Sequence, residues 1–351
     1  MFLTDTCDRI GYNENKVIID DFIYFTYLDS DLYNHVVKCD KELNIILDKK
    51  LNKATDNHGG CSIVKDKKGY IHLLGGGHST LNSYYYKSSL PNDISEFETV
   101  LFKEPSTYMY MFVINDKICV IYRQNIINNS NYDKLVYIEK NIDDKDFDYN
   151  NKIMINELDN NYIAGYSINV THLDNKLFLT FNWYNISRDY SETTLTLIKK
   201  DNENYFRRIN NTPLLSLITH NDYDFICNDT RNTNVVNIEN EYYFLSTSMI
   251  NGTIEIINIF KNTKNELFKI NDGFVNSISK VNEYYLLFIT TNNELHVIKT
   301  YDFINFNVVE KINVYNTLKW NTCYANNVYE NEIYFFTLIK NKLLKFKRGV
   351  Y

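Results

Sequence analysis

The chain has 351 residues, of which 44% are hydrophobic and 15% aromatic, and its formal net charge at pH 7 is −7. This length suits two average domains or one large all-β domain, and the apolar content is enough for a sizeable core. The negative charge, with no cluster of basic residues, argues against a general nucleic-acid-binding protein.

The six cysteines, at positions 7, 39, 61, 119, 227 and 323, are widely spaced and include no C-x-x-C pair. They predict buried free thiols rather than a metal site or a dense disulfide framework. No stretch is long and apolar enough for a membrane span, and the first residues lack the charged and apolar regions of a signal peptide. We therefore expect no membrane association, and either a cytoplasmic protein or a secreted one whose signal was removed.

One pattern recurs along the chain: a short apolar strand, a polar turn rich in Asp, Asn, Lys and Glu, and a second strand that opens with aromatic or aliphatic residues. Seven such hairpins lie near residues 17–25, 61–74, 111–122, 168–181, 235–245, 275–289 and 326–336. Most are followed by a third apolar strand, as at 84–88, 193–198, 254–260 and 295–298, and by a weaker fourth. Four antiparallel strands repeated in this way predict an all-β, seven-bladed β-propeller with four-stranded antiparallel blades.

The last repeat supplies about three of its four strands and ends near Phe346. We expect residues 1–10 to provide the missing strand and close the ring, because closure removes an exposed sheet edge. The chain has three prolines and no low-complexity linker, so residues 1–351 are predicted to form one domain. The long segments 125–165 and 205–232 are interpreted as loops that set specificity.

The second hairpin is bracketed by two histidines. His58 precedes its first strand, and His78 follows its second. In antiparallel pairing the start of one strand lies beside the end of its partner, so both histidines should meet at one end of the hairpin. Five of the 11 glycines fall at 59–60 and 75–77, which indicates either tight turns or close approach of a ligand.

Equivalent positions of the next hairpins carry further polar and aromatic residues. Tyr108 precedes the third hairpin and Arg123 follows it, Tyr166 precedes the fourth, and Trp183 and Tyr184 follow the fourth. Propellers bind ligands near the central channel, where such loops gather. Arg123 is one of seven arginines, and its rigid, permanently charged guanidinium suits a carboxylate. These positions predict one binding site on consecutive blades.

Several short segments resemble the BNR-repeat-containing family, whose members are seven-bladed propellers and include ulvan-type polysaccharide lyases. The matching segments are 56–58, 69–72, 77–78, 84–88, 90–91 and 93–94. The resemblance is clearest over residues 55–125, weaker as far as 185 and only architectural beyond. Asp56-Asn57-His58 stands where typical members have Asp-Asp-His, and the Ser-x-Asp-x-Gly-x-Thr-Trp box leaves only a faint trace at 299–303.

The resemblance implies β-elimination at a uronic acid of an acidic polysaccharide. Arg123 would pair with the carboxylate and stabilise the enolate-like intermediate. His58 or Tyr108 would take the C5 proton, and a Tyr or His would protonate the departing O4; which residue is acid and which is base stays open. The predicted catalytic residues are His58, His78, Tyr108, Arg123 and Tyr166, with Tyr162 as a competing match for Tyr166. The predicted substrate-binding residues are Asn57, Tyr122, Trp183 and Tyr184.

Three other functions stay open from the sequence. A non-catalytic carbohydrate-binding propeller would use the same aromatic side chains. A sialidase-like glycoside hydrolase would need an arginine cluster, which seven arginines disfavour. A protein-interaction scaffold is the third, because fold alone does not imply function. We expect an acidic polysaccharide or oligosaccharide as partner, a monomer, no cofactor and no metal in the site, with a structural metal ion left open.

Overall fold

The computed structural model describes residues 17–125, 133–227, 229–270, 273–281, 283–291, 294–313, 324–329, 332–339 and 342–349. All regular elements within these ranges are β-strands, which confirms the predicted all-β class. This part of the chain accordingly has no helix able to span a membrane. Apart from the last strand, the strands fall into two compact units, one ending at Ile155 and the other beginning at Asn156.

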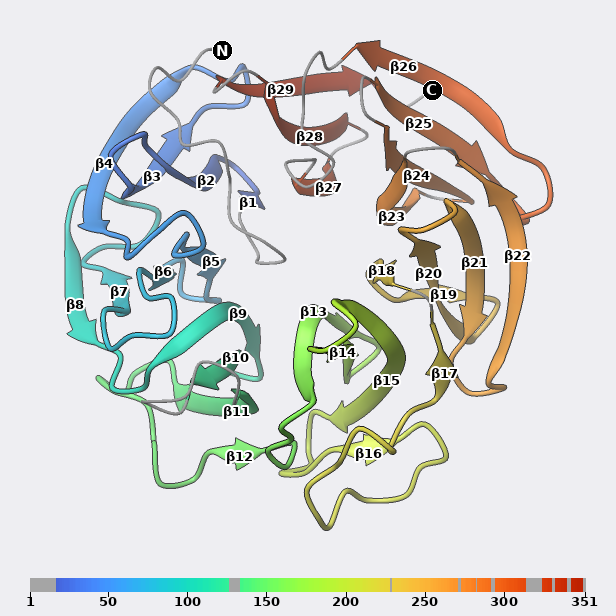
Figure 1. Cartoon of the computed structure of the whole chain (residues 1–351). Helices are drawn as coiled ribbons and strands as arrows, with labels where there is room; N and C mark the ends of the chain where they lie inside the picture. The colour runs from blue at the N-terminus through green and yellow to red at the C-terminus, as the bar shows by residue number, and fades with distance from the viewer. Residues whose placement is uncertain are drawn as a thin grey trace. The chain divides into compact units, whose positions relative to one another are not determined.

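Three four-stranded antiparallel sheets form the first unit, coloured blue to green in Figure 1. The first contains β1 (Val17–Ile19), β2 (Ile23–Leu28), β3 (Tyr33–Cys39) and β4 (Ile45–Lys53). The second contains β5 (Ser62–Lys65), β6 (Ile71–Gly75), β7 (Tyr84–Ser88) and β8 (Phe97–Leu101). The third contains β9 (Ser106–Ile114), β10 (Lys117–Asn125), β11 (Asp133–Asn141) and β12 (Ile153–Met154). Strands lie side by side in chain order, so each sheet is a simple meander.

The second unit repeats this design with additions. Its first sheet contains β13 (Tyr162–Leu173), β14 (Lys176–Asn185), β15 (Tyr190–Lys200), β16 (Arg207–Arg208) and β17 (Phe225–Ile226). The next contains β18 (Thr230–Asn232), β19 (Val236–Ile238), β20 (Glu241–Ser248), β21 (Thr253–Asn258) and β22 (Thr263–Lys269). The third contains β23 (Phe274–Val281), β24 (Tyr284–Thr290), β25 (Glu294–Thr300) and β26 (Asn307–Asn313). The last strands, β27 (Tyr324–Tyr329), β28 (Glu332–Ile339) and β29 (Lys342–Gly349), form a three-stranded sheet.

All seven predicted hairpins occur as paired strands, namely β1–β2, β5–β6, β9–β10, β13–β14, β19–β20, β23–β24 and β27–β28. The segments interpreted as long loops differ from expectation, because β11 and β12 lie within 125–165 and three short strands lie within 205–232. The predicted closing strand at residues 1–10 lies outside the described residues. The closed ring and the single domain therefore stay predictions.

The middle strands are buried on both faces. On β6, Leu73 packs in a cluster with residues of the first sheet, whereas its neighbour Leu74 packs with residues of the third. On β20, Phe244 and Leu245 divide in the same way between the two flanking sheets of the second unit. Neighbouring side chains on a strand point to opposite faces, so a strand covered on both sides must be apolar throughout. This explains the continuous apolar runs of the sequence.

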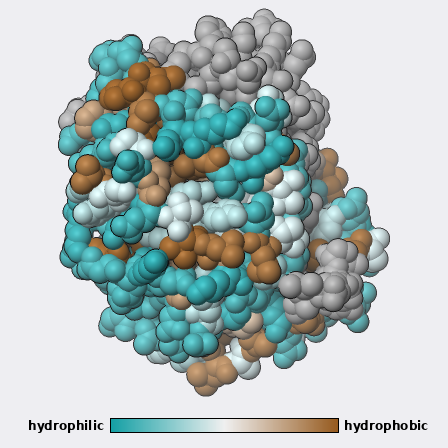
Figure 2. All heavy atoms as spheres, turned by 90° about the vertical axis from the view of Figure 1, so that its left-hand side faces the viewer, coloured by the Kyte–Doolittle hydropathy of each residue, from teal (hydrophilic) through white to brown (hydrophobic). Residues whose placement is uncertain are grey.

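The outermost strands face solvent instead. β4, β8 and β22 consist mainly of exposed or half-buried residues. Figure 2 shows one face of the molecule on which hydrophilic side chains dominate and apolar ones stand in small groups. Polar groups able to do chemistry are therefore best sought where the inner strands begin and end, since the faces of the inner strands are packed.

A network of charged groups ties the first sheet together. His35 Nδ1 lies 2.7 Å from Asp48 Oδ1, and its Nε2 lies 3.2 Å from Asp29 Oδ2. The Tyr27 ring stacks on the imidazole with centroids 4.6 Å apart, and Lys50 pairs with Asp29 at 3.2 Å. Burial by itself would lower the pKa of His35, but the two carboxylates outweigh it and the pKa is raised.

The raised pKa of His35 gives stability a specific pH dependence. The contribution of His35 to the free energy of unfolding is fully present below the unfolded-state pKa of about 6.5. It is lost as the pH rises through the higher folded-state pKa. The His35→Gln variant should therefore lose more stability relative to the native protein at about pH 5 than at about pH 8. Urea unfolding of both proteins at each pH measures the difference, and an equal loss at the two pH values would contradict the assignment.

Candidate active site

Two loops at one end of the β5–β6 hairpin carry the histidines. His58 precedes β5 and His78 follows β6, and the two strands pair antiparallel with Ser62 opposite Leu74. The backbone joins the loops directly, because the N–H of Gly76 donates to the carbonyl of Gly59 at 2.9 Å. The imidazole centroids lie 4.5 Å apart. The histidines thus meet as antiparallel pairing predicts.

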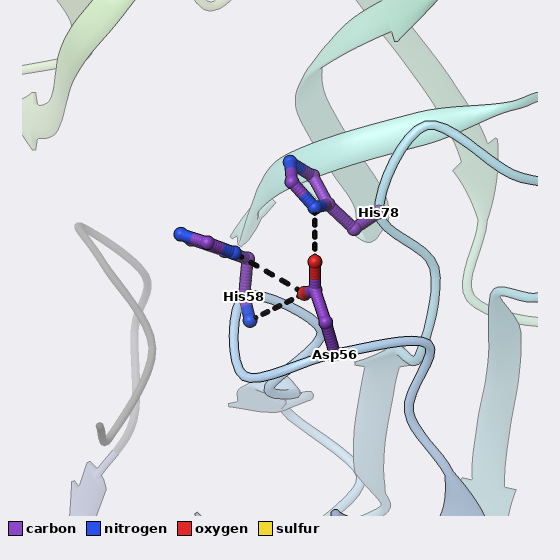
Figure 3. Close-up of side chains that lie close together, drawn as sticks. All are labelled: Asp56, His58 and His78. Atoms are coloured by element: carbon purple, nitrogen blue, oxygen red, sulfur yellow. Dashed lines mark hydrogen bonds and ion pairs between the residues drawn. The ribbon is translucent and has the colours of Figure 1, made fainter. Parts of the chain in front are cut away.

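Asp56 bridges the two imidazoles (Figure 3). One carboxylate oxygen accepts the backbone N–H of His58 at 2.8 Å and lies 3.2 Å from its Nδ1, while the other lies 2.5 Å from Nδ1 of His78. Both rings therefore turn Nδ1 toward the carboxylate and Nε2 away from it. Burial alone would raise the pKa of Asp56, but the bonds from His58 and His78 more than offset this and the pKa is lowered.

Sequence reasoning did not select Asp56 as a site residue. A signal was present, because an aspartate two positions before another residue commonly accepts that residue's backbone N–H in an Asx turn. Here the turn brings the carboxylate to His58, and the hairpin brings His78 to the same carboxylate. Local turn geometry could have predicted the first contact, and strand pairing the second.

Glycines allow the two loops to touch. A Cβ placed on Gly59 would lie 2.5 Å from the carbonyl oxygen of Gly76, and one on Gly75 would lie 2.6 Å from Cα of Cys61. Both obstacles are backbone, which cannot rotate away as a side chain can. Of the two explanations for the glycine cluster, tight packing of the loops is the one that these distances support.

Buried polar side chains hold the loops from outside. Asn34 donates to the carbonyl of Gly59 at 3.1 Å, and Thr26 donates to the carbonyl of Cys61 at 2.6 Å. The Thr107 hydroxyl accepts the backbone N–H of Ser79 at 2.8 Å. Each of the three side chains is at most 2% exposed. The first sheet thus fixes the His58 loop and the third sheet fixes the His78 loop, which leaves the histidines little freedom.

Tyr108 and Arg123 extend the site on the third sheet. The Tyr108 ring lies 6.1 Å from the His58 ring and 6.2 Å from the His78 ring. The guanidinium carbon of Arg123 lies 5.0 Å from the Tyr108 centroid, and Arg123 is 7% exposed. Tyr108 has a φ of 51°, next to an irregularity in β9–β10 pairing before Arg123. Positive φ is uncommon for a bulky residue and clusters at functional sites.

The structure thus brings four of the five predicted catalytic residues together within the first unit: His58, His78, Tyr108 and Arg123. Tyr166 belongs to β13 of the second unit, and its side chain lies outside the described residues. The competing match, Tyr162, donates a hydrogen bond to Glu192 at 2.7 Å and stacks on His220 within that second unit.

Two predicted substrate-binding residues are core residues instead. Tyr122 is 0% exposed and packs edge-to-face against Phe102, and Trp183 is 0% exposed and donates to the carbonyl of Asp222 at 3.2 Å. Tyr122 and Arg123 are neighbours on one strand, so their side chains take opposite faces and only one of them can join the site. Asn57 and Tyr184 are half-buried, Asn57 in the loop between Asp56 and His58 and Tyr184 beside Asp189 in the second unit.

The same cluster could also hold a metal ion. Ligand atoms of Asp56, His58 and His78 lie within 4.8 Å of one another, and no other group of His, Cys, Asp and Glu in the described ranges meets that condition. Imidazole nitrogen and carboxylate oxygen are common ligands of zinc.

The sequence matches no protein-family model and no curated protein. Solved structures match along the whole chain. An ulvan lyase described as a new polysaccharide lyase family, PL25, aligns with a TM-score of 0.75 and 10% identity, covering 99% of this chain and 94% of that one. A PL25 ulvan lyase bound to -[GlcA(1-4)Rha3S]- aligns with a TM-score of 0.73 and 10% identity, covering 100% and 96%. Polysaccharide lyase Uly1 aligns with a TM-score of 0.67 and 10% identity, covering 97% and 91%.

The chain shares the fold of these lyases. At 10% identity the likeness establishes architecture alone, so the chemistry must be argued from the residues of the site. Membership of the BNR-repeat family stays a prediction.

Substituting Gly59 tests the loop contact. Gly59→Ala should cost about 1–3 kcal/mol of stability, because its Cβ meets backbone. Gly69→Ala is the matched control at the other turn of the hairpin, where φ is +89°, and should cost about 1–2 kcal/mol through strain. NMR signals of the His58 and His78 imidazoles should shift in Gly59→Ala only. Unchanged imidazole signals in that variant would show that the contact does not place the histidines.

Proposed function

We propose that the protein is a polysaccharide lyase that cleaves a uronic-acid-containing polysaccharide by β-elimination. The observation that carries the proposal is the joint placement of four side chains. His58 and His78 meet at Asp56, the Tyr108 ring lies beside both imidazoles, and Arg123 lies beside the Tyr108 ring. The shared fold of the ulvan lyases supports it. Acid–base residues beside a permanent cation match the needs of this reaction.

In the proposed reaction the C5–H bond of the uronate breaks, a C4–C5 double bond forms and the C4–O4 bond breaks. Negative charge develops on the carboxylate as the C5 proton leaves. Arg123 is always charged and nearly buried, so its charge is screened less by water than that of an exposed arginine. It would therefore stabilise the enolate-like intermediate, as preorganised charge does in other acyl and carbanion reactions.

The proton transfers fall to the histidines and Tyr108. With Nδ1–H donated to Asp56, a neutral imidazole keeps Nε2 as a proton acceptor, and this tautomer is inferred from the hydrogen-bond partners. Both Nε2 atoms turn away from Asp56 in Figure 3. We assign removal of the C5 proton to His58 or Tyr108, and protonation of O4 to a tyrosine or histidine of the same group. Asp56 acts as a positioning residue for both rings.

The substrate class follows from the cation and from the similar enzymes. A uronate supplies both the acidic C5–H and the carboxylate that would pair with Arg123. One lyase of the same fold binds -[GlcA(1-4)Rha3S]-, which supports an acidic polysaccharide as partner here. The net charge of −7 is no obstacle, because binding depends on the local field of the site.

We also propose that the sheets are the blades of one closed seven-bladed β-propeller in a single domain. Six sheets of four or five strands and one of three strands occur within the described residues. A fourth strand from residues 1–10 would complete the last blade, and the whole-length likeness to ulvan lyases supports this architecture.

A panel of uronate polysaccharides tests the proposed activity. Wild-type protein should increase the ultraviolet absorbance of the C4–C5 unsaturated product, and His58→Ala and Arg123→Ala should lower kcat/KM by about 10²–10⁴-fold. His172→Ala, which removes a histidine paired with Asp201 in the second unit, should keep full activity. Binding without absorbance change would indicate a non-catalytic carbohydrate-binding protein, and neither signal a protein-interaction scaffold.

The tyrosine hydroxyl can be tested separately. Tyr108→Phe keeps the ring near the histidines and over Arg123 but removes the proton donor, so kcat should fall about 10²-fold with little change in KM. Tyr110→Phe removes a hydroxyl from the same strand and should leave both constants unchanged. Steady-state kinetics of the two variants provide the comparison, and equal activity would remove Tyr108 from the acid–base group.

A further inference from the structure

The cluster of Asp56, His58 and His78 has a second chemical capacity besides proton transfer. Two imidazole nitrogens and one carboxylate oxygen form the donor set that zinc takes in open sites, with the remaining position left to water. We propose that this cluster binds one divalent transition ion of the Zn²⁺ type, and that the bound ion suppresses acid–base chemistry there. The second half of this inference rests on the proposed lyase function.

The spacing of the donors fits such an ion after small movements. Tetrahedral zinc with bonds of about 2.0–2.1 Å places its ligand atoms about 3.3 Å apart. Nδ1 of His58 lies 3.2 Å from one carboxylate oxygen of Asp56, and Nδ1 of His78 lies 2.5 Å from the other. The donor atoms of all three residues lie within 4.8 Å of one another. The ion would replace the protons now shared between these atoms, and the side chain ends would adjust to reach tetrahedral spacing.

The cluster is accessible and is supported from behind. The His58, His78 and Asp56 side chains are 21%, 28% and 40% exposed, so an ion and its water can reach them. The loops that carry them are fixed by the buried side chains of Asn34 and Thr107. Because the loop backbone is fixed and the ends of the side chains can adjust, an ion can bind without rearranging the loops.

Other histidines in the described ranges lack this combination. His172 meets Asp201, and His296 meets Glu294, each without a third donor that completes a metal-binding group. They are therefore matched controls, since each is a histidine paired with a carboxylate.

Binding through Nδ1 would change which tautomer the histidines adopt. An imidazole that coordinates an ion through Nδ1 carries its remaining proton on Nε2. That Nε2 is then a donor and can no longer accept a proton from substrate. The ion thus converts the ring from a base into a metal ligand without any change in the fold, and it blocks every step of the proposed reaction in which a histidine accepts a proton.

Calorimetric titration of Zn²⁺ into the full-length, chelator-treated protein tests the binding site. Wild-type protein should bind one equivalent, and His58→Ala, His78→Ala and the near-isosteric Asp56→Asn should bind at least about tenfold more weakly. His172→Ala and His296→Ala should bind like wild type, and circular dichroism checks that each variant is folded. Absence of binding by wild type, or equal binding by His78→Ala, would overturn the proposal.

Activity provides the second readout. Zn²⁺ should inhibit polysaccharide cleavage with a midpoint that matches the dissociation constant from calorimetry, and chelator should restore the rate. Stimulation by Zn²⁺ would reject the inhibitory half. Absence of lyase activity would reject the proposed function and the inhibition together. Because calorimetry needs no substrate, it would still test metal binding independently.

Discussion

The contact between the backbones of Gly59 and Gly76 is the constraint on which the site depends. It holds the loop before β5 and the loop after β6 at hydrogen-bonding distance, and no residue with a Cβ fits at Gly59 without displacing backbone. Because the loops cannot separate, the rings of His58 and His78 stay within 4.5 Å, and one carboxylate can reach both. The proposed acid–base chemistry and the proposed metal binding both depend on this spacing.

The packing of the sheets explains why the candidate site gathers at loops and near the ends of inner strands. The middle strands are apolar on both faces because neighbouring sheets cover them, so a catalytic group cannot stand on those faces without being buried. The few polar side chains between sheets, such as Asn34 and Thr107, are instead satisfied by loop backbone. Breaking either of these hydrogen bonds would leave a buried polar group unpaired, which costs free energy. The burial that stabilises the sheets therefore also fixes the loops of the site.

The sequence predicted what depends on local pairing rules and missed what depends on tertiary environment. The hairpins follow from apolar runs and polar turns, and the meeting of His58 with His78 follows from antiparallel pairing. Tyr122 was assigned to substrate through the resemblance and Trp183 through its place after a predicted strand. Both lie in the core, because neighbouring packing buries nearly every residue of β10 and β14. Asp56 was not selected because it contacts histidines from two loops, which only the folded hairpin brings together.

Strand β11 was missed because the charged residues at its ends, such as Asp133 and Lys140, hide an apolar centre.

The backbone of the site is held in an unfavourable conformation at Tyr108, where φ is 51°. Positive φ costs a bulky residue about 1–3 kcal/mol, which the surrounding structure must offset. Part of the compensation is visible, because the ring lies over the Arg123 guanidinium and near both histidines. An arginine under a tyrosine ring also raises the local positive charge, which favours an anionic substrate and disfavours a bare cation. The carboxylate of Asp56 acts in the opposite sense, so the balance between Arg123 and Asp56 would decide between the proposed anionic substrate and the proposed metal ion.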